Sequence, residues 1–205
     1  MAVLIGDVVR SRDATDRQRL HDGLLAAFAA LPRWVTPLDP VRVTVGDEFQ
    51  GVFGHVGAAL DAAFRLRLLL LPEVDTRYGV AWGTVTRLDA TTQDGPAWWA
   101  AREAIDWVKE TAAHPATRRT RTAYRSAAPG APDPGALNAA LLCRDHLVGS
   151  WDDRSIRIMR GLMTEHTQAE LAEAEGISAS AVSQRVRAGG LATVLTSAGW
   201  LAELP

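Results

Sequence analysis

The sequence predicts an α+β domain followed by an all-α domain, and three features of its 205 residues lead to this prediction. Before residue 127, apolar residues alternate between the two-residue period of strands and the 3.6-residue period of helices. Residues 127–135 contain three prolines and two glycines, which no regular element accommodates, so they predict a linker. All apolar segments after the linker have helical spacing. We therefore expect two domains, at residues 1–126 and 136–205.

The first domain is expected to hold a mainly antiparallel sheet. Alternating or short apolar runs predict strands at residues 2–5, 41–45, 49–53 and 77–86, of which the second and third form a hairpin. Helical spacing predicts helices at residues 16–31, 56–71 and 96–111. This order is typical of an α+β sandwich with its helices on one face of the sheet.

Five helices are expected after the linker. Their apolar spacing, interrupted by glycines and polar steps, places them at residues 137–148, 152–163, 167–174, 180–187 and 191–201. The third and fourth of these surround the most specific motif in the chain.

Composition excludes several classes of protein. The chain has 22 basic and 24 acidic residues and a net charge of −2, which excludes a uniformly basic surface for nucleic acid. The single Cys143 excludes a disulfide framework. No segment approaches the roughly 18 apolar residues of a membrane-spanning helix, and no charged leader opens the chain. We expect a reduced, soluble, cytoplasmic protein without membrane contact.

Four arginines gather just before the linker. They are Arg118, Arg119, Arg121 and Arg125. Such a run favours a solvated loop, and an arm that contacts phosphates is the alternative.

Residues 167–187 have the pattern of two helices joined by a tight turn. Ala172 is small where a second helix would cross, Gly176 suits a left-handed turn, and Ser178 suits a helix cap. Val182 and Val186 would form the buried stripe of the second helix. The segment resembles the helix-turn-helix of bacterial transcription regulators and sigma-factor-like domains, in which the second helix enters the DNA major groove.

This resemblance implies a set of DNA contacts. Gln184 would pair with an adenine edge, while Arg185 and Arg187 would anchor phosphates. The full expected set is Thr167, Gln168, Ser178, Ala179, Ser180, Ser183, Gln184, Arg185 and Arg187. Two arginines release few counterions, so tight binding to double-stranded DNA would need a homodimer or the arginine arm. A plain helical hairpin used for dimerisation is the alternative.

Two aspartates stand where a metal site would need them. Asp7 follows the first strand, and Asp47 lies in the hairpin turn, so paired strands would place both at one edge of the sheet. Carboxylates at such an edge suit Mg²⁺, which completes its shell with water and substrate phosphates. In the alternative, Asp7 caps a loop and Asp47 satisfies its own turn, with Arg12 and Arg102 neutralising them.

Four segments resemble the signature segments of class III nucleotidyl cyclases. They are Leu-Ile-Gly-Asp-Val-Val at residues 4–9, Thr-Val-Gly-Asp at 44–47, and residues 77–83 and 95–102. At the level of the whole chain the sequence resembles the SatD family, on Gly-Asp-Val-Val-x-Ser-Arg at 6–12, Gly-Asp-Glu-Phe-Gln at 46–50 and Asp-Gly-x₅-Ala-Arg at 94–102. The resemblance implies a ferredoxin-like, cyclase-type palm domain with a helix-turn-helix after it.

The resemblance also assigns roles to residues. Asp7, Asp47 and the Val8 carbonyl match metal ligands, and Arg102 matches the catalytic arginine that stabilises phosphates. Trp98 and Val43 stand where cyclases have an asparagine and a base-recognising lysine. The expected phosphate-binding or nucleotide-binding residues are Arg10, Ser11, Arg12, Glu48, Gln50 and Arg102. We therefore expect a degenerate cyclase-like site, and the sequence leaves open whether that site still performs catalysis.

The function expected from the sequence is a DNA-binding transcription regulator of SatD type. Its palm domain would bind a nucleotide or another phosphorylated ligand with Mg²⁺, and ligand binding would change the geometry of a homodimer on DNA. The alternative is a nucleotidyl cyclase-like or other nucleotide-processing enzyme that uses the helix-turn-helix for targeting or dimerisation.

Overall fold

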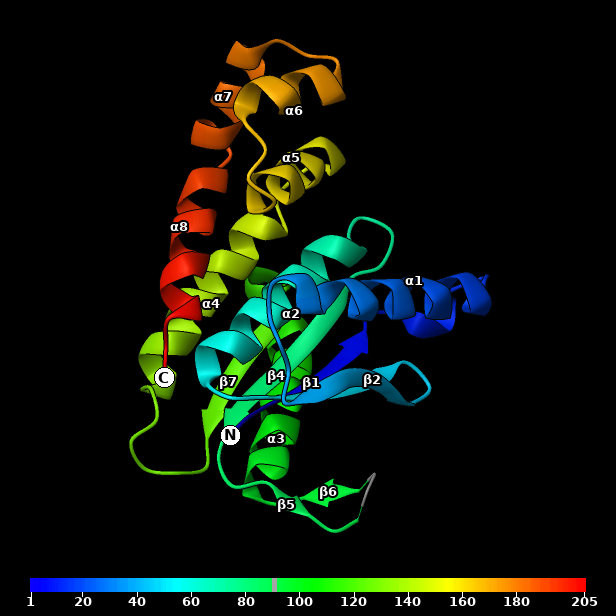
Figure 1. Ribbon diagram of the computed structural model, residues 1–205, viewed down its shortest axis with the longest axis vertical. Coiled ribbons are helices and arrows are strands. Elements are labelled where there is room, and N and C mark those ends of the chain that lie inside the picture. The colour runs from blue at the N-terminus through cyan, green and yellow to red at the C-terminus, as the bar shows by residue number, and fades with distance from the viewer. Residues whose placement is uncertain (90–91) are drawn as a thin grey trace.

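The computed structural model describes residues 1–89 and 92–205 and shows a mixed α+β protein built on a five-stranded sheet (Figure 1). The strand order is β2 (Asp39–Val45), β3 (Glu48–Phe53), β1 (Ala2–Val8), β4 (Thr76–Trp82) and β7 (Thr122–Ser126). Neighbouring strands are antiparallel except β4 and β7, which are parallel. Strands β5 (Thr86–Arg87) and β6 (Gln93–Asp94) form a small separate hairpin. The mainly antiparallel α+β prediction is confirmed.

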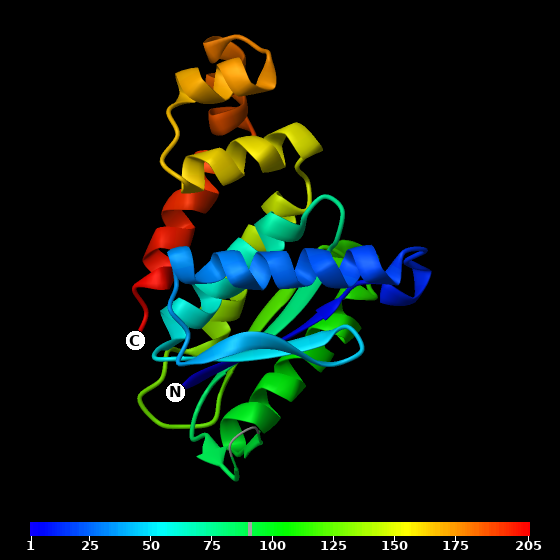
Figure 2. The same cartoon turned by 45° about the vertical axis from the view of Figure 1, so that its right-hand side comes forward.

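Helices cover both faces of this sheet, so the expectation that they lie on one face is wrong (Figure 2). Helices α1 (Arg17–Ala30) and α2 (Val56–Leu70) share a core with Leu4, Phe49 and Tyr78. Helix α3 (Pro96–Ala112) packs on the opposite face against Val3 and Ile5. The physical reason is visible in β1, whose seven residues are all buried and which therefore needs cover on both sides.

Helix α3 lies unusually close to β4 because Gly79 has no side chain. A Cβ at Gly79 would lie 2.2 Å from the carbonyl oxygen of Ala101 and 2.6 Å from the backbone nitrogen of Ile105. The helix therefore rests directly on the strand. This close approach brings Arg102 and Lys109 of α3 over the polar end of β1.

The C-terminal part contains five helices, as predicted. They are α4 (Pro134–Val148), α5 (Asp153–Met163), α6 (Gln168–Glu175), α7 (Ala179–Ala188) and α8 (Leu191–Ala202), and short 3₁₀ turns occur at Ser11–Asp13, Leu31–Arg33 and Pro115–Thr117. Helices α5 to α8 share an apolar core that also receives Phe64 and Leu68 from α2. No helix within the described part of the chain is long and apolar enough to cross a membrane.

The predicted boundary at the 127–135 linker does not separate two independent cores. Leu137 and Leu141 of α4 lie in the core beside the five-stranded sheet, and Asn138 exchanges hydrogen bonds of 2.8 and 3.0 Å with the backbone of Tyr124. The last residues return to the N-terminal part as well, because the N–H of Val56 donates to the carbonyl of Pro205 at 3.1 Å. Figure 1 shows α8 running beside α4 back toward the sheet. Residues 136–205 therefore form part of one packed body.

A buried carboxylate on α4 joins this helix to the sheet. Asp145 is 1% exposed and accepts a hydrogen bond of 2.8 Å from Nη1 of Arg67 on α2. Its second oxygen accepts the backbone N–H groups of Arg121 and Thr122, at 2.7 and 2.6 Å, where β7 begins. One side chain thus ties together α2, α4 and the edge strand.

A second buried cation lies beside this pair. Arg144 is 4% exposed, its guanidinium lies 5.0 Å from the centroid of the Phe64 ring, and burial lowers its pKa. Loss of Asp145 would therefore leave two buried guanidinium groups and two backbone N–H groups with a poorer set of partners.

We predict that Asp145→Ala lowers the free energy of unfolding by about 3–5 kcal/mol, the usual cost of removing one partner from a buried ion pair. The measurement is urea denaturation followed by circular dichroism. Asp106→Ala is the control, because Asp106 pairs with Lys109 at 3.3 Å on an exposed surface and its loss should cost less than about 1 kcal/mol. Equal effects of the two substitutions would contradict the role given to Asp145.

Candidate functional site

Asp7 ends up in a compensated ion-pair cluster rather than in an open cleft. It lies near the end of β1, on the face covered by α3, and is 7% exposed. Its Oδ1 lies 2.8 Å from Nε of Arg77 on β4, and its Oδ2 lies 3.1 Å from Nζ of Lys109 on α3. Both carboxylate oxygens therefore already have cationic partners.

The expected magnesium site does not fit this arrangement. Asp47 lies half-buried in the turn between β2 and β3, and Val8 is the last residue of β1, paired with Thr76. Within residues 1–89 and 92–205, no three histidine, cysteine or acidic side chains are grouped so that they could hold a metal ion. A divalent cation at Asp7 would have to displace Arg77 and Lys109, so we derive no chemistry from one.

Arg102, the expected catalytic and phosphate-binding residue, is held by Glu48. Its two terminal nitrogens lie 2.6 and 2.5 Å from the two carboxylate oxygens of Glu48, a bidentate pair that joins α3 to the start of β3. The hydrogen bonds that Arg102 donates to Glu48 raise the pKa of Arg102. The Arg102 side chain is 43% exposed, but both of its terminal nitrogens already donate hydrogen bonds to Glu48.

A cavity of about 390 Å³ lies beside this pair, at the N-terminal end of α3. It is lined by Ile5, Gln50, Gln93, Trp98, Trp99 and Arg102. Two buried polar atoms there, Nε1 of Trp98 and Oε1 of Gln93, have no hydrogen-bond partner within the part of the chain that the structure describes. Of the residues predicted from the sequence, the cavity contains only Gln50 and Arg102. Trp98 and Gln93 were missed, although the adjacent tryptophans at the start of α3 were an available signal.

The other expected phosphate-binding residues lie elsewhere. Arg10 has a left-handed backbone with φ of 56° and lines a different cavity, at the opposite end of α3. Ser11 begins a 3₁₀ turn and its carbonyl accepts a hydrogen bond of 3.0 Å from Arg17. Arg12 is exposed in the same turn. The structure therefore places Gln50 and Arg102 in one cavity and Arg10 in another, instead of gathering the expected set around Asp7.

The predicted helix-turn-helix has the geometry that its sequence indicates. Thr167 caps α6 and forms a reciprocal capping box with Glu170. Gly176 ends the helix in the left-handed conformation with φ of 63°, and the Ser178 hydroxyl caps α7 by accepting from the N–H of Ala181 at 3.2 Å. Val182 of α7 is fully buried against the other helices. These local signals fix the angle between α6 and α7.

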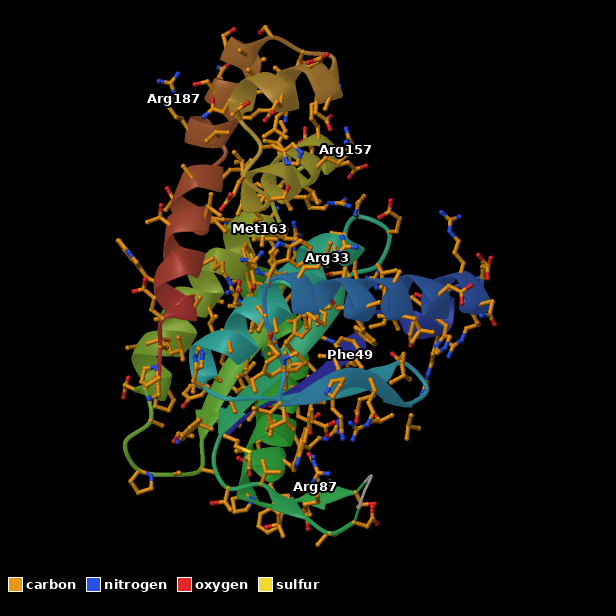
Figure 3. All side chains as sticks on the ribbon, in the orientation of Figure 1. Arg33, Phe49, Arg87, Arg157, Met163 and Arg187 are labelled. Carbon is orange, nitrogen blue, oxygen red and sulfur yellow. The ribbon has the colours of Figure 1, made fainter. Side chains whose placement is uncertain are left out.

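The outward face of α7 carries few charged groups. On α7, Ser183 is partly exposed, and the side chains of Ala179, Ser180, Gln184 and Arg187 are exposed. Thr167 and Gln168 at the start of α6 are exposed as well. Figure 3 shows Arg187 projecting away from the body of the helices. Arg185 does not join this face, because its Nη1 lies 2.8 and 2.9 Å from the two carboxylate oxygens of Asp152 and 3.1 Å from the Ser155 hydroxyl. Its expected phosphate contact is replaced by an ion pair that holds α7 on α5.

Three comparisons with known proteins bear on this geometry. A family model described as the SatD family matches residues 1–203. No curated protein matches the chain. Among solved structures, a bacterial light-regulated adenylyl cyclase is similar with a TM-score of 0.46 and 13% identity, over 60% of this chain and 42% of that one. The chain thus spans less than half of that cyclase.

The ion pair between Asp152 and Arg185 generates a pH prediction. Hydrogen bonds from Ser155 and then from Arg185 lower the pKa of Asp152 from 3.8 to about 2. Because the folded-state pKa is depressed, the carboxylate stabilises the protein above about pH 4, and this contribution is lost as the pH falls toward 2.

We predict that Asp152→Asn, which can still cap α5, lowers the free energy of unfolding at pH 7 by less than about 1 kcal/mol because solvent screens the pair. Urea denaturation at pH 7, 4 and 3 should show that the difference in free energy of unfolding between variant and wild type becomes smaller at pH 3. A difference that stays constant, or grows, as the pH falls would contradict this assignment.

Proposed function

The chain belongs to the SatD family, and on that premise we propose that this protein is a DNA-binding transcription regulator whose palm domain senses a phosphorylated ligand. One observation carries the proposal: α7 buries its apolar stripe and leaves a polar face free, at an end of the molecule away from the sheet (Figures 1 and 3). A recognition helix needs this combination, because it must be held rigidly from behind while its outer side chains reach base edges.

The outward residues of α7 match the chemistry of major-groove recognition. The Gln184 amide can donate and accept at the N6 and N7 atoms of adenine, and the Ser180 hydroxyl can serve a base or a phosphate. Arg187 supplies a cation whose only hydrogen bond among the described residues is a long one of 3.4 Å to the carbonyl of Ser183. The remaining contacts would come from the N-terminus of α7, because at α6 the Glu170 carboxylate already accepts the N–H of Thr167.

Charge favours a homodimer as the DNA-binding form. Arg154 and Arg157 of α5 are both paired with Glu175, and Arg185 is paired with Asp152. Arg187 is therefore the main cation that α7 offers to phosphates. One such helix would gain little from counterion release, whereas two copies on two half-sites would double the contacts.

A chain of contacts supports control of DNA binding by a ligand of the palm domain. Asp145 fixes α4 on the sheet, and Trp151, three residues after the end of α4, donates from Nε1 to the carbonyl of Gly189 at 2.7 Å. Gly189 is the C-terminal cap of α7. A shift of the α4 end relative to the sheet would therefore move the recognition helix directly.

The enzymatic alternative has less support in the geometry. Asp7 and Arg102, the residues that cyclase-type chemistry would use, are each occupied by an oppositely charged partner within the chain. Turnover would require both pairs to open.

We predict that Gln184→Ala relaxes sequence preference, costing about 1–3 kcal/mol on the preferred site and less on other sequences. Arg187→Ala should weaken binding to all duplexes alike and make the salt dependence of the affinity shallower by about one unit per chain. The measurement is fluorescence anisotropy with duplexes selected from promoter DNA, at several salt concentrations, together with the stoichiometry of chains per duplex.

The matched control is Arg87→Ala, which removes an exposed arginine from the β5–β6 hairpin at the far end of the molecule (Figure 3). It should leave both affinity and salt slope unchanged. If Gln184→Ala and Arg187→Ala behaved like this control, α7 would not be the recognition helix.

A further inference from the structure

A large polar cavity lies at the C-terminal end of α3. Its volume is about 790 Å³, which is within the range of small-molecule sites. Its walls come from the turn after β1, the loop between α2 and β4, the start of β4, the end of α3, the loop before β7 and the end of α4. We call it the cationic cavity because its walls contain six basic side chains: Arg10, Arg77, Lys109, Arg118, Arg119 and Arg121.

The charge of this cavity is exceptional for the chain. Against its six cations the lining has only two carboxylates, Glu73 and Asp75, an excess of four positive charges in a protein whose net charge is −2. Counting Asp7 and Asp106, which pair with Arg77 and Lys109 from outside the lining, still leaves an excess of two. Clustered like charges destabilise a folded protein, so a cluster of this size indicates a bound counter-charge.

Three of the six cations form ion pairs within the chain, and the other three have no side-chain partner among the described residues. Arg121 is fixed by Asp75 at 2.7 Å and by the carbonyl oxygens of Arg118 and Thr120, both at 2.8 Å. Arg77 and Lys109 are fixed by Asp7. Among the described residues, the side chains of Arg10, Arg118 and Arg119 make no hydrogen bond or ion pair. These three guanidinium groups are available to an anion inside a preorganised frame.

The aliphatic part of the Arg119 side chain packs directly on the backbone of Gly149, at the end of α4. A Cβ on Gly149 would lie 3.0 Å from Cγ and 3.1 Å from Cδ of Arg119. The stem of Arg119 therefore packs on the chain just before Trp151, so an anion held by Arg119 would contact the joint between α4 and α5.

We propose that the cationic cavity binds the polyphosphate group of a small soluble molecule, such as a nucleoside triphosphate or inorganic tripolyphosphate. The proposal rests on the ligand-sensing part of the proposed function and gives that ligand a site. Each unpaired guanidinium group can bind one phosphate through two parallel hydrogen bonds. Three such groups therefore suit a chain of several phosphates better than a single phosphate.

Among the described residues that line the cavity, none has an aromatic side chain on which a nucleobase would stack. The proposal therefore makes the phosphates, and not a base, the recognised group. The volume of the cavity suits a small molecule, whereas a DNA duplex contacts a more extended protein surface. The cavity at the other end of α3, with Trp98 and Trp99, lacks such an excess of cations.

The test is isothermal titration calorimetry of the full chain, without DNA, using tripolyphosphate, pyrophosphate, orthophosphate and ATP at constant ionic strength. We expect tripolyphosphate to bind more tightly than orthophosphate. The double substitution Arg118→Ala with Arg119→Ala should weaken binding by about 10- to 100-fold, the effect of losing charge-assisted hydrogen bonds. Arg87→Ala, which removes an exposed arginine outside the cavity, should leave binding unchanged.

A second measurement separates binding from folding. Because the cations repel one another, the double variant should melt at the same temperature as wild type or higher, but should lose the rise in melting temperature that tripolyphosphate gives to wild type. ATP binding no tighter than tripolyphosphate would identify the phosphates as the whole recognised group, and tighter binding would add a nucleoside contact to the same site.

Three results would overturn the proposal. They are no heat with tripolyphosphate at about 1 mM, equal binding by the double variant and wild type, and a double variant that loses DNA binding while keeping tripolyphosphate binding. The last result would make the arginines part of a DNA interface. None of them bears on Gln184 or Arg187, whose test uses DNA without the ligand.

Discussion

The structure depends on a single buried carboxylate. Asp145 on α4 satisfies two backbone N–H groups at the start of β7 and the guanidinium of Arg67 on α2, all with distances of 2.8 Å or less. The N–H groups of a parallel edge strand would otherwise lack partners in a buried setting, and an unsatisfied buried donor costs about 1–3 kcal/mol. By fixing the start of β7, Asp145 also positions the preceding loop, which contains Arg118 and Arg119 of the cationic cavity. Because Asp145 anchors α4, it also holds the helix that leads to α5 and the helix-turn-helix.

Local signals in the sequence predicted the C-terminal helices well, because each boundary is set by a residue that acts on its own neighbours. Gly176 takes the left-handed conformation and Ser178 caps α7 whatever surrounds them. The assignment of α4 to a separate domain failed for the opposite reason. The prolines and glycines of residues 127–135 do break regular structure, but they cannot indicate which core Leu137 will enter. The position of α3 depends on Gly79, whose meaning appears only once a helix is laid over it.

The candidate site was predicted by residue type but not by pairing. Arg102 and Arg185 have the chemistry expected of phosphate ligands, yet Glu48 and Asp152 from other elements occupy them. Nothing in a linear sequence indicates which acidic group will meet which cation. The run that begins at Arg118 favours a solvated loop by its sequence, with a phosphate-contacting arm as the alternative. The fold places three of its four arginines in one cavity with Lys109 and with Arg10, which is far away in sequence.

The account makes the cavity and the recognition helix parts of one packed unit, connected through the end of α4 and the hydrogen bond from Trp151 to Gly189. The most direct measurement is the affinity of the protein for its preferred duplex with and without saturating tripolyphosphate, at constant ionic strength. The account predicts a change of about fivefold or more, in either direction, that disappears when Arg118 and Arg119 are replaced by alanine. An affinity that is the same with and without tripolyphosphate bound would contradict it.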